Sequence, residues 1–176
     1  TQEKEAISRI ANRLGLNQEG LSTRAKISIL RDFFSNEFQY TTHLKTPGVE
    51  RGRRSSAVGM FLETTRAGHC EYFASAMVVL ARSEGLSSRL VNGFAGGIPN
   101  EVGDFVEVSR ADAHAWVEIH FEEAGWVRFD PTPPYLRLRD ADSRSVWERL
   151  AQFGSALELW WFQRIVDFDS ADQIAA

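Results

Sequence analysis

The chain changes its hydrophobic period near its middle. In the first half, apolar residues recur every three or four positions, which is the spacing of an amphipathic helix. This pattern predicts helices over residues 3–14, 22–38 and 70–84, the last ending at Gly85. Its apolar face consists of Phe73, Ala76, Met77, Leu80 and Ala81. After Gly85 the period becomes two, which is typical of strands.

The second half predicts a sheet. Apolar and polar residues alternate in four segments separated by turns with Gly or Pro: 89–94, 105–108, 115–121 and 126–129. The prolines after Asp130 end the last segment, because proline has no N–H to donate to a ladder. A final helix is expected over about 145–166. Helices packed on an antiparallel sheet make an α+β fold, and 176 residues predict a single domain over 1–176.

Composition narrows the class of protein. The chain has 43% hydrophobic and 25% charged residues, which is ordinary for a globular domain. Its net charge of −4 offers no basic field for phosphates, so we expect no nucleic acid partner. No apolar run has the roughly 20 residues of a membrane span, and no signal peptide is visible. Because the sequence opens at Thr1, we expect a fragment or a processed form.

The aromatic segment from Leu157 to Phe168 allows two interpretations. An amphipathic helix packed on the domain is the favoured one, and a membrane-proximal helix is the alternative.

Cys70, the chain's single cysteine, is a candidate nucleophile. A lone cysteine is more often a small buried apolar residue. Cys70, however, stands where the helix over 70–84 should begin, and the positive end of a helix favours thiolate over thiol. The free N–H groups of that first turn are also able to bind an oxyanion.

A thiol nucleophile needs a base, and His114 is the best placed of the four histidines. Alternation from Asp112 to Phe121 turns Ala115, Val117, Ile119 and Phe121 toward the core, and His114, Trp116, Glu118 and His120 toward the other face. His120 lies nearer the turn, His69 should diverge from Cys70 as the helix begins, and His43 lies in a polar loop. None of these three is eliminated by the sequence.

Asp130 is the candidate partner of His114. It shares the non-core face, and a carboxylate there can fix the imidazole tautomer and stabilise its charged form. Pro131 biases Asp130 toward an extended backbone. Glu118 and Asp112 are rival carboxylates, and a simple turn residue before proline is the structural alternative for Asp130.

The register of the hairpin decides whether these residues meet. Apolar residues share a face only if paired residue numbers sum to an even value. A three-residue loop over 123–125 pairs Glu118 with Asp130, which leaves His114 about 13 Å further along. Pairing Trp116 with Asp130 instead makes His114 a diagonal neighbour. A triad of Cys70, His114 and Asp130 therefore predicts a longer or bulged turn.

Three linked segments resemble the transglutaminase-like superfamily. Cys70 lies in Thr65–Arg82, which leads to Arg89–Phe94; His114 lies in Asp112–Glu118, and Asp130 in Gly125–Thr132. The motif-bearing core covers about 60–135. The resemblance implies a papain-like fold, called the transglutaminase core. It also implies acyl transfer through a thioacyl-enzyme, in which Cys70 attacks a carboxamide or peptide carbonyl and His114 acts as base and then acid.

The resemblance carries further expectations. The substrate would be a protein or peptide, and the chain an extracytoplasmic domain, periplasmic or at the cell surface, of a membrane-anchored bacterial protein. The N–H of Cys70 would bind the oxyanion; Tyr40 is a candidate second donor, and Trp116 and Trp126 are candidate groove walls. We expect no cofactor and no metal, because Asp140-Ala-Asp142 lacks the glycine and glutamate of an EF-hand loop.

Two other functions remain open. A cysteine peptidase or amidase would use the same three residues, because the choice between water and an amine depends on the shape of the groove. A non-catalytic binding or structural domain would keep the fold without the chemistry.

Overall fold

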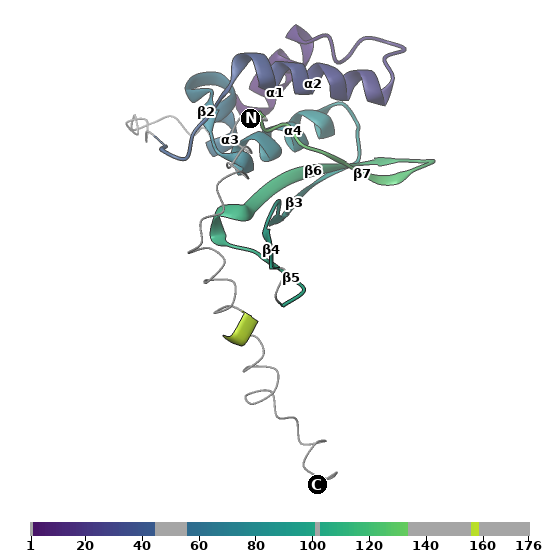
Figure 1. The fold of residues 1–176 in the computed structure, drawn as a ribbon. Helices are drawn as coiled ribbons and strands as arrows, with labels where there is room; N and C mark the ends of the chain where they lie inside the picture. Colours follow the sequence, from purple (N-terminus) through teal and green to yellow (C-terminus); the bar gives the residue numbers. More distant parts are fainter. Residues whose placement is uncertain (1, 45–55, 101–102, 134–155, 159–176) are drawn as a thin grey trace, which may run out of the picture. The chain divides into compact units, whose positions relative to one another are not determined.

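The computed structural model describes residues 2–44, 56–100, 103–133 and 156–158 (Figure 1). The chain divides into two compact units, one of Thr1–Phe94 with Ala113–Leu136 and one of Ala95–Asp112 with Arg137–Ala176. The single domain over 1–176 stays a prediction. Most of the helix predicted over about 145–166 lies outside the described residues; the described part, residues 156–158, is helical.

Helices make up the first part of the first unit. Their bounds are α1 Gln2–Arg13, α2 Thr23–Glu37, α3 Ala57–Met60, a π-helical segment Phe61–Thr65, and α4 Cys70–Ser83. Ser22 caps α2 by accepting a hydrogen bond from the N–H of Ala25 at 3.2 Å. The three helices expected from the sequence are confirmed, whereas α3 and the π-helical segment were not predicted.

Strands complete the first unit. Its strands are β1 Gln39–Tyr40, β2 Ala67–Gly68, β3 Ser88–Phe94, β6 Ala113–Phe121 and β7 Gly125–Phe129. The last three form an antiparallel sheet in the order β3-β6-β7, and β1 and β2 form a short parallel pair. Figure 1 shows the helices gathered on one side of the three-stranded sheet. The α+β class is thereby confirmed.

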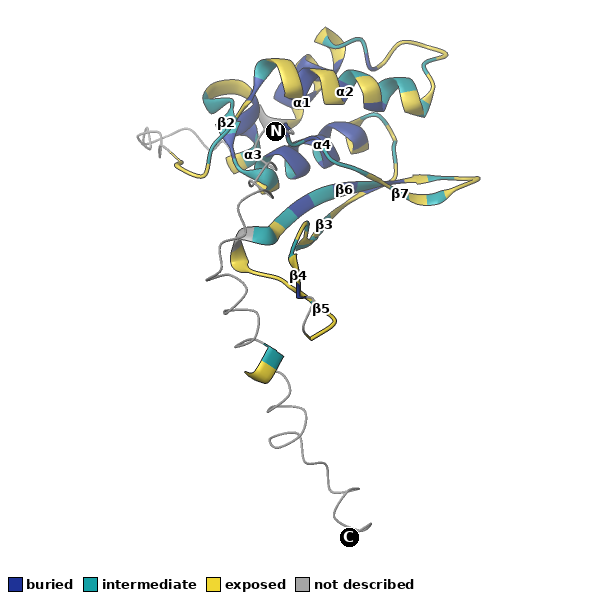
Figure 2. Ribbon diagram, in the orientation of Figure 1, coloured by how far each residue is buried: buried dark blue, intermediate teal, exposed yellow. Residues whose placement is uncertain are grey.

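The core lies between the helices and the sheet. Helix α4 packs against β6 and also against α1 and α2, so it is the central element of this unit (Figure 2). All five apolar residues predicted for its inner face are fully buried. On β6, Ala115, Val117 and Ile119 are at most 1% exposed, which confirms the predicted alternation.

The described part of the second unit is mainly a hairpin. Strands β4 Ile98–Asn100 and β5 Phe105–Glu107 pair antiparallel, and a 3₁₀ turn, Arg110–Asp112, follows. Strand β4 was not predicted. In the part of the chain that the structure describes, no helix combines the length and the apolar character that crossing a membrane requires.

Candidate active site

Cys70 is the first residue of α4, as expected from its place in the sequence. The preceding π-helical segment ends at Thr65 and is followed by Arg66, which has a left-handed backbone with φ 46°. This bend sends the chain into β2, which lies beside β1 through the pairs Gln39 with Ala67 and Tyr40 with Gly68. Cys70 is half-buried and is a free thiol.

The hairpin has the register that brings His114 to Asp130. Val117 pairs with Phe129, so one further step along the ladder places Trp116 opposite Asp130. The expectation of a longer or bulged turn was wrong, however. Three residues, Glu122–Ala124, separate Phe121 from its partner Gly125. This loop begins one residue earlier than a loop over 123–125. The reason is that Gly125, with φ 66°, is the first residue of β7 and not the last residue of the turn.

His114 and Asp130 form a direct hydrogen bond. The Nε2 atom of His114 lies 2.7 Å from Oδ2 of Asp130, and the two side chains are only 11% and 16% exposed. An ionised carboxylate has no hydrogen to give, so Nε2–H of His114 is the donor. The other oxygen, Oδ1, accepts the N–H of Thr132 at 2.9 Å. Asp130 is therefore held from two sides.

The hydrogen bond from the N–H of Thr132 to Asp130 was not predicted from the sequence. A signal for it was present, because an aspartate that bonds the backbone two residues on is a common turn feature.

The electrostatics of Cys70 depend on His114. Burial raises the pKa of the Cys70 thiol, but several contacts outweigh burial and leave this pKa below its usual value. They are a hydrogen bond from the side chain of His114, a backbone hydrogen bond from Ala115, the charge of His114 and a backbone hydrogen bond from Glu71. Cys70, His114 and Asp130 thus form one connected chain of interactions.

The other three histidines have different surroundings. His69 precedes α4 and stacks edge-on against Tyr72, with ring centres 4.9 Å apart. His120 lies against Trp126 at 5.2 Å, near the turn of the hairpin. His43 is exposed beyond β1. None of these side chains is among the groups that shift the pKa of Cys70.

The other two candidate carboxylates, Glu118 and Asp112, interact with Arg89 and Ser109. Glu118 forms an ion pair with Arg89 at 2.7 Å across β3 and β6. Asp112 accepts hydrogen bonds from the backbone N–H and the hydroxyl of Ser109, both at 2.8 Å. The short hydrogen bond to the imidazole of His114 is made by Asp130.

The two weaker candidates have different positions. Burial raises the pKa of Tyr40, and so does the negative charge of Cys70, which places the phenol within electrostatic reach of the thiolate. The strands that carry Tyr40 and Gly68 are only two residues long, too short to show a pattern in the sequence. The indole of Trp116 lies against Gly93 and under the guanidinium of Arg128. The other tryptophan considered as a groove wall, Trp126, pairs with His120 at the turn of the hairpin, six residues along β6 from His114. A groove-wall role stays a prediction for Trp116.

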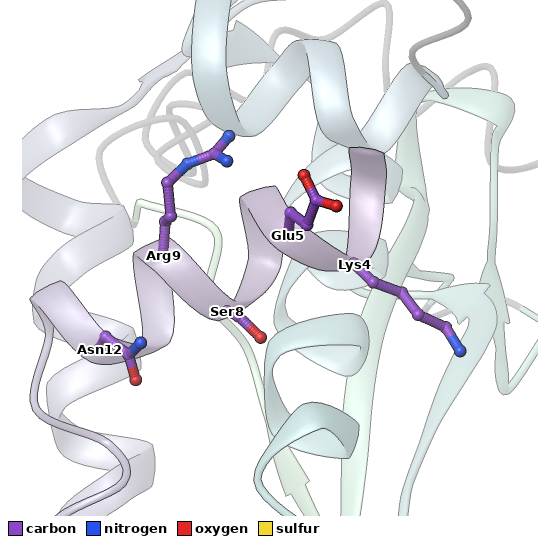
Figure 3. Close-up of a pocket in the computed structure, with 5 residues that line it drawn as sticks. All are labelled: Lys4, Glu5, Ser8, Arg9 and Asn12. Atoms are coloured by element: carbon purple, nitrogen blue, oxygen red, sulfur yellow. The ribbon is translucent and has the colours of Figure 1, made fainter. Parts of the chain in front are cut away.

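A surface hollow on α1 is separate from these residues. Figure 3 shows its lining side chains, which all come from this one helix: Lys4, Glu5, Ser8, Arg9 and Asn12. One of them, Arg9, forms an exposed ion pair with Glu63 at 2.8 Å. The hollow contains none of the residues that surround Cys70, and we assign it no part in the site.

Two known proteins have sequences similar to a large part of the chain. The chain is 40% identical over 112 residues to the protein YebA of Bacillus subtilis, a match covering 61% of the chain and 15% of YebA. It is 38% identical over 118 residues to a protein-glutamine gamma-glutamyltransferase of Pseudomonas aeruginosa, covering 66% of the chain and 17% of that protein. The chain thus spans only about a sixth of the length of these relatives.

The fold has a solved counterpart. The periplasmic domain of TgpA from Pseudomonas aeruginosa, in its crystal structure bound to ethylmercury, aligns with a TM-score of 0.61 and 34% identity. The alignment covers 74% of the chain and 44% of that domain. The fold is accordingly the papain-like, transglutaminase-core type that the sequence predicted. The family model of the transglutaminase-like superfamily matches residues 8–131, which include Cys70, His114 and Asp130. The chain belongs to the transglutaminase-like superfamily.

Proposed function

We propose that the chain catalyses acyl transfer through Cys70, with His114 as base and Asp130 as the partner of His114. The observation that carries this proposal is the lowered pKa of Cys70, because the contacts that lower it come largely from His114, itself hydrogen-bonded to Asp130 at 2.7 Å. A thiolate is the reactive form of cysteine, and a base within hydrogen-bond reach is the usual means of forming it. A purely structural cysteine needs neither neighbour.

The hydrogen bond to Asp130 supports a separate role for each ring nitrogen of His114. Because Nε2 of His114 bonds Asp130, Nδ1 is the nitrogen that can exchange a proton with Cys70. The thiolate sulfur attacks the carbonyl carbon of a carboxamide, and the imidazolium gives its proton to the departing ammonia or amine. A thioester remains. Water or a primary amine, deprotonated by His114, then attacks the thioester and releases the thiol.

Two donors can stabilise the tetrahedral intermediate. The N–H of Cys70 lies in the first turn of α4, where helical N–H groups have no helical acceptor. The hydroxyl of Tyr40 is the second donor that we propose, because Tyr40 lies close enough to Cys70 for the thiolate charge to raise its pKa beyond the effect of burial. An oxyanion formed next to that sulfur would occupy the same region.

The name of one relative supports a class of substrate. One relative at 38% identity is named a protein-glutamine gamma-glutamyltransferase, so we propose the side chain of a protein or peptide glutamine as acyl donor. Similarity to a periplasmic domain supports an extracytoplasmic location, and a membrane-anchored full-length protein agrees with it. A cysteine peptidase or amidase with the same triad stays the alternative, because the acceptor is not determined by these three residues.

Active-site titration tests whether Cys70 is catalytic. The rate of alkylation of Cys70 by iodoacetamide is measured from pH 5 to pH 9 in the wild type and in His114→Gln. Because the folded pKa of the thiol is lowered, the wild type should react in mild acid, where an ordinary thiol is protonated, and His114→Gln should lose this reactivity. A wild-type profile equal to that of a model thiol would contradict catalysis and favour a binding domain.

A second measurement identifies the acceptor. Glutamine-containing peptides are incubated with the protein and a primary amine, and the products are weighed by mass spectrometry. Amine incorporation indicates a transglutaminase, deamidation indicates water as the acceptor, and cleavage indicates a peptidase. Cys70→Ala is the control, which should give none of the three products.

A further inference from the structure

Trp116 is held beside His114 by both neighbouring strands. It follows His114 by two residues on β6, so the two side chains project from the same face of the sheet. Gly93 of β3 lies directly opposite His114. The indole of Trp116 lies on this glycine, since a Cβ added at Gly93 would come within 2.7 Å of Cη2. From β7, the guanidinium of Arg128 lies 4.0 Å from the ring centre.

Packing alone does not account for an indole at this position. The Nε1 atom of Trp116 is buried and has no hydrogen-bond partner among the described residues. A buried donor without an acceptor lowers the free energy of unfolding. A phenylalanine or leucine would fill much of the same space without burying a donor. The chain thus carries a larger ring than an apolar contact requires.

The position of this ring relates it to the bond between His114 and Asp130. Gly93, on which the ring rests, is the residue opposite His114, and Asp130 lies opposite Trp116 one step beyond the last ladder pair. The bond lies near the end of the sheet, yet its side chains are only 11% and 16% exposed. Hydrogen bonds to charged groups are stronger where water is excluded.

We propose that Trp116 is a positioning residue, whose indole, seated on Gly93 and under Arg128, screens the hydrogen bond between His114 and Asp130 from water. The screened bond keeps the imidazole oriented for exchange of a proton with Cys70. This inference rests on the function proposed for Cys70 and His114.

The chain provides a matched control for the stack of Trp116 and Arg128. A second arginine lies over a second tryptophan on the same sheet, Arg89 over Trp126 at 4.1 Å, next to the turn of the hairpin and opposite His120. Trp116→Leu and Trp126→Leu therefore remove similar stacks at the two ends of one sheet. A third variant, Gly93→Ala, displaces the ring of Trp116 without changing it.

Two measurements are made on these variants. The first is proton NMR of the downfield resonance of the proton between His114 and Asp130, which gives its rate of exchange with water. The second is the rate of alkylation of Cys70 as a function of pH. In Trp116→Leu and Gly93→Ala we expect exchange to be about tenfold faster. We also expect the midpoint of alkylation to rise by about one pH unit. Trp126→Leu should keep both wild-type values. Thermal unfolding shows which variants are folded. If Trp116→Leu does not fold, the results for Gly93→Ala test the inference in its place.

Three results would overturn the inference. They are wild-type exchange and alkylation in folded Trp116→Leu, equal changes in Trp126→Leu, and a wild-type proton that already exchanges too fast to be observed in the cold. Proton exchange does not require turnover, so screening is measured even in an inactive chain. Unchanged alkylation in His114→Gln would instead contradict the proposed function.

Discussion

Each oxygen of the Asp130 carboxylate accepts a different hydrogen bond, Oδ2 from Nε2 of His114 and Oδ1 from the N–H of Thr132. In Asp130→Asn the amide offers one acceptor oxygen. If this oxygen keeps the N–H of Thr132, the amide NH2 faces Nε2 of His114 and favours the imidazole tautomer with its proton on Nδ1, which cannot act as the base for Cys70. We expect kcat/KM to fall by about 100-fold or more, with a small change in the unfolding temperature. Steady-state kinetics and thermal unfolding check both. Wild-type activity in the folded variant would remove Asp130 from the proposed triad.

Tyr40 provides a second prediction at the scale of the residue. If its hydroxyl donates to the oxyanion, Tyr40→Phe should lower kcat by about 100-fold or more with little change in KM. Alkylation of Cys70 forms no oxyanion, so its rate should stay close to that of the wild type. Equal losses in turnover and alkylation would show that the hydroxyl acts on the thiol and not on the intermediate.

At the scale of the element, α4 combines a structural and a chemical role. Its buried face forms the centre of the core, and its first residue is Cys70. Gly68, two residues earlier, packs against the first turn: an added Cβ would lie 3.0 Å from both Cβ and Cγ of Tyr72. The Cβ of Tyr72 is fixed to the helix backbone, so a side chain at position 68 must shift either the helix start or β2 by a few tenths of an ångström.

Gly68→Ala should therefore affect activity more than stability. A displaced first turn misplaces the thiol, and we expect kcat/KM to fall by about tenfold or more. Gly85→Ala is the control at the other end of α4. Nothing lies within 4 Å of its added Cβ, but φ is 78°, so this variant should lose about 1 kcal/mol of unfolding free energy and keep its activity. The opposite pattern in the two variants would contradict this assignment.

Some helices and strands could be predicted from the sequence, and others could not. The period of the apolar residues was sufficient to predict α1, α2, α4 and the faces of β6 and β7, because long amphipathic segments must bury one side. It could not predict β1 and β2, which are two residues long and depend on the left-handed turn at Arg66. The apolar pattern restricted the pairing of β6 with β7 to registers in which the numbers of two paired residues have an even sum. The residue at which the turn starts depends on the conformation of Gly125, which the apolar pattern does not encode.

The same contrast holds for the site. Cys70, His114 and Asp130 were recognisable from residue type, face and local motif. Thr132 and Ala115 act through backbone N–H groups, which any residue carries, and so leave little trace in side-chain chemistry.

At the scale of the whole molecule, the core and the candidate site belong to one unit. The connected cluster of buried apolar residues runs from Ile7 to Ile119. It takes no member from the described residues of 95–112, the hairpin segment of the second unit. The match to the family model, residues 8–131, ends just after Asp130, close to the end of the first unit at Leu136. The described residues of 95–112 therefore contribute nothing to the core cluster of the first unit.

Removal of that segment tests the division. Phe94 and Ala113 are partners at the end of β3 and β6, so an Asn-Gly turn can replace residues 95–112 and close the strands as a two-residue hairpin. We expect the unfolding temperature to change by no more than about 5 °C, because none of the described residues in this segment belongs to the core cluster. Alkylation of Cys70 should keep its acidic profile, because the contacts that lower the pKa of its thiol come from His114, Ala115 and Glu71, all in the first unit. A chain that no longer folds, or a thiol that regains the profile of a free cysteine, would show that the hairpin segment is required by the first unit.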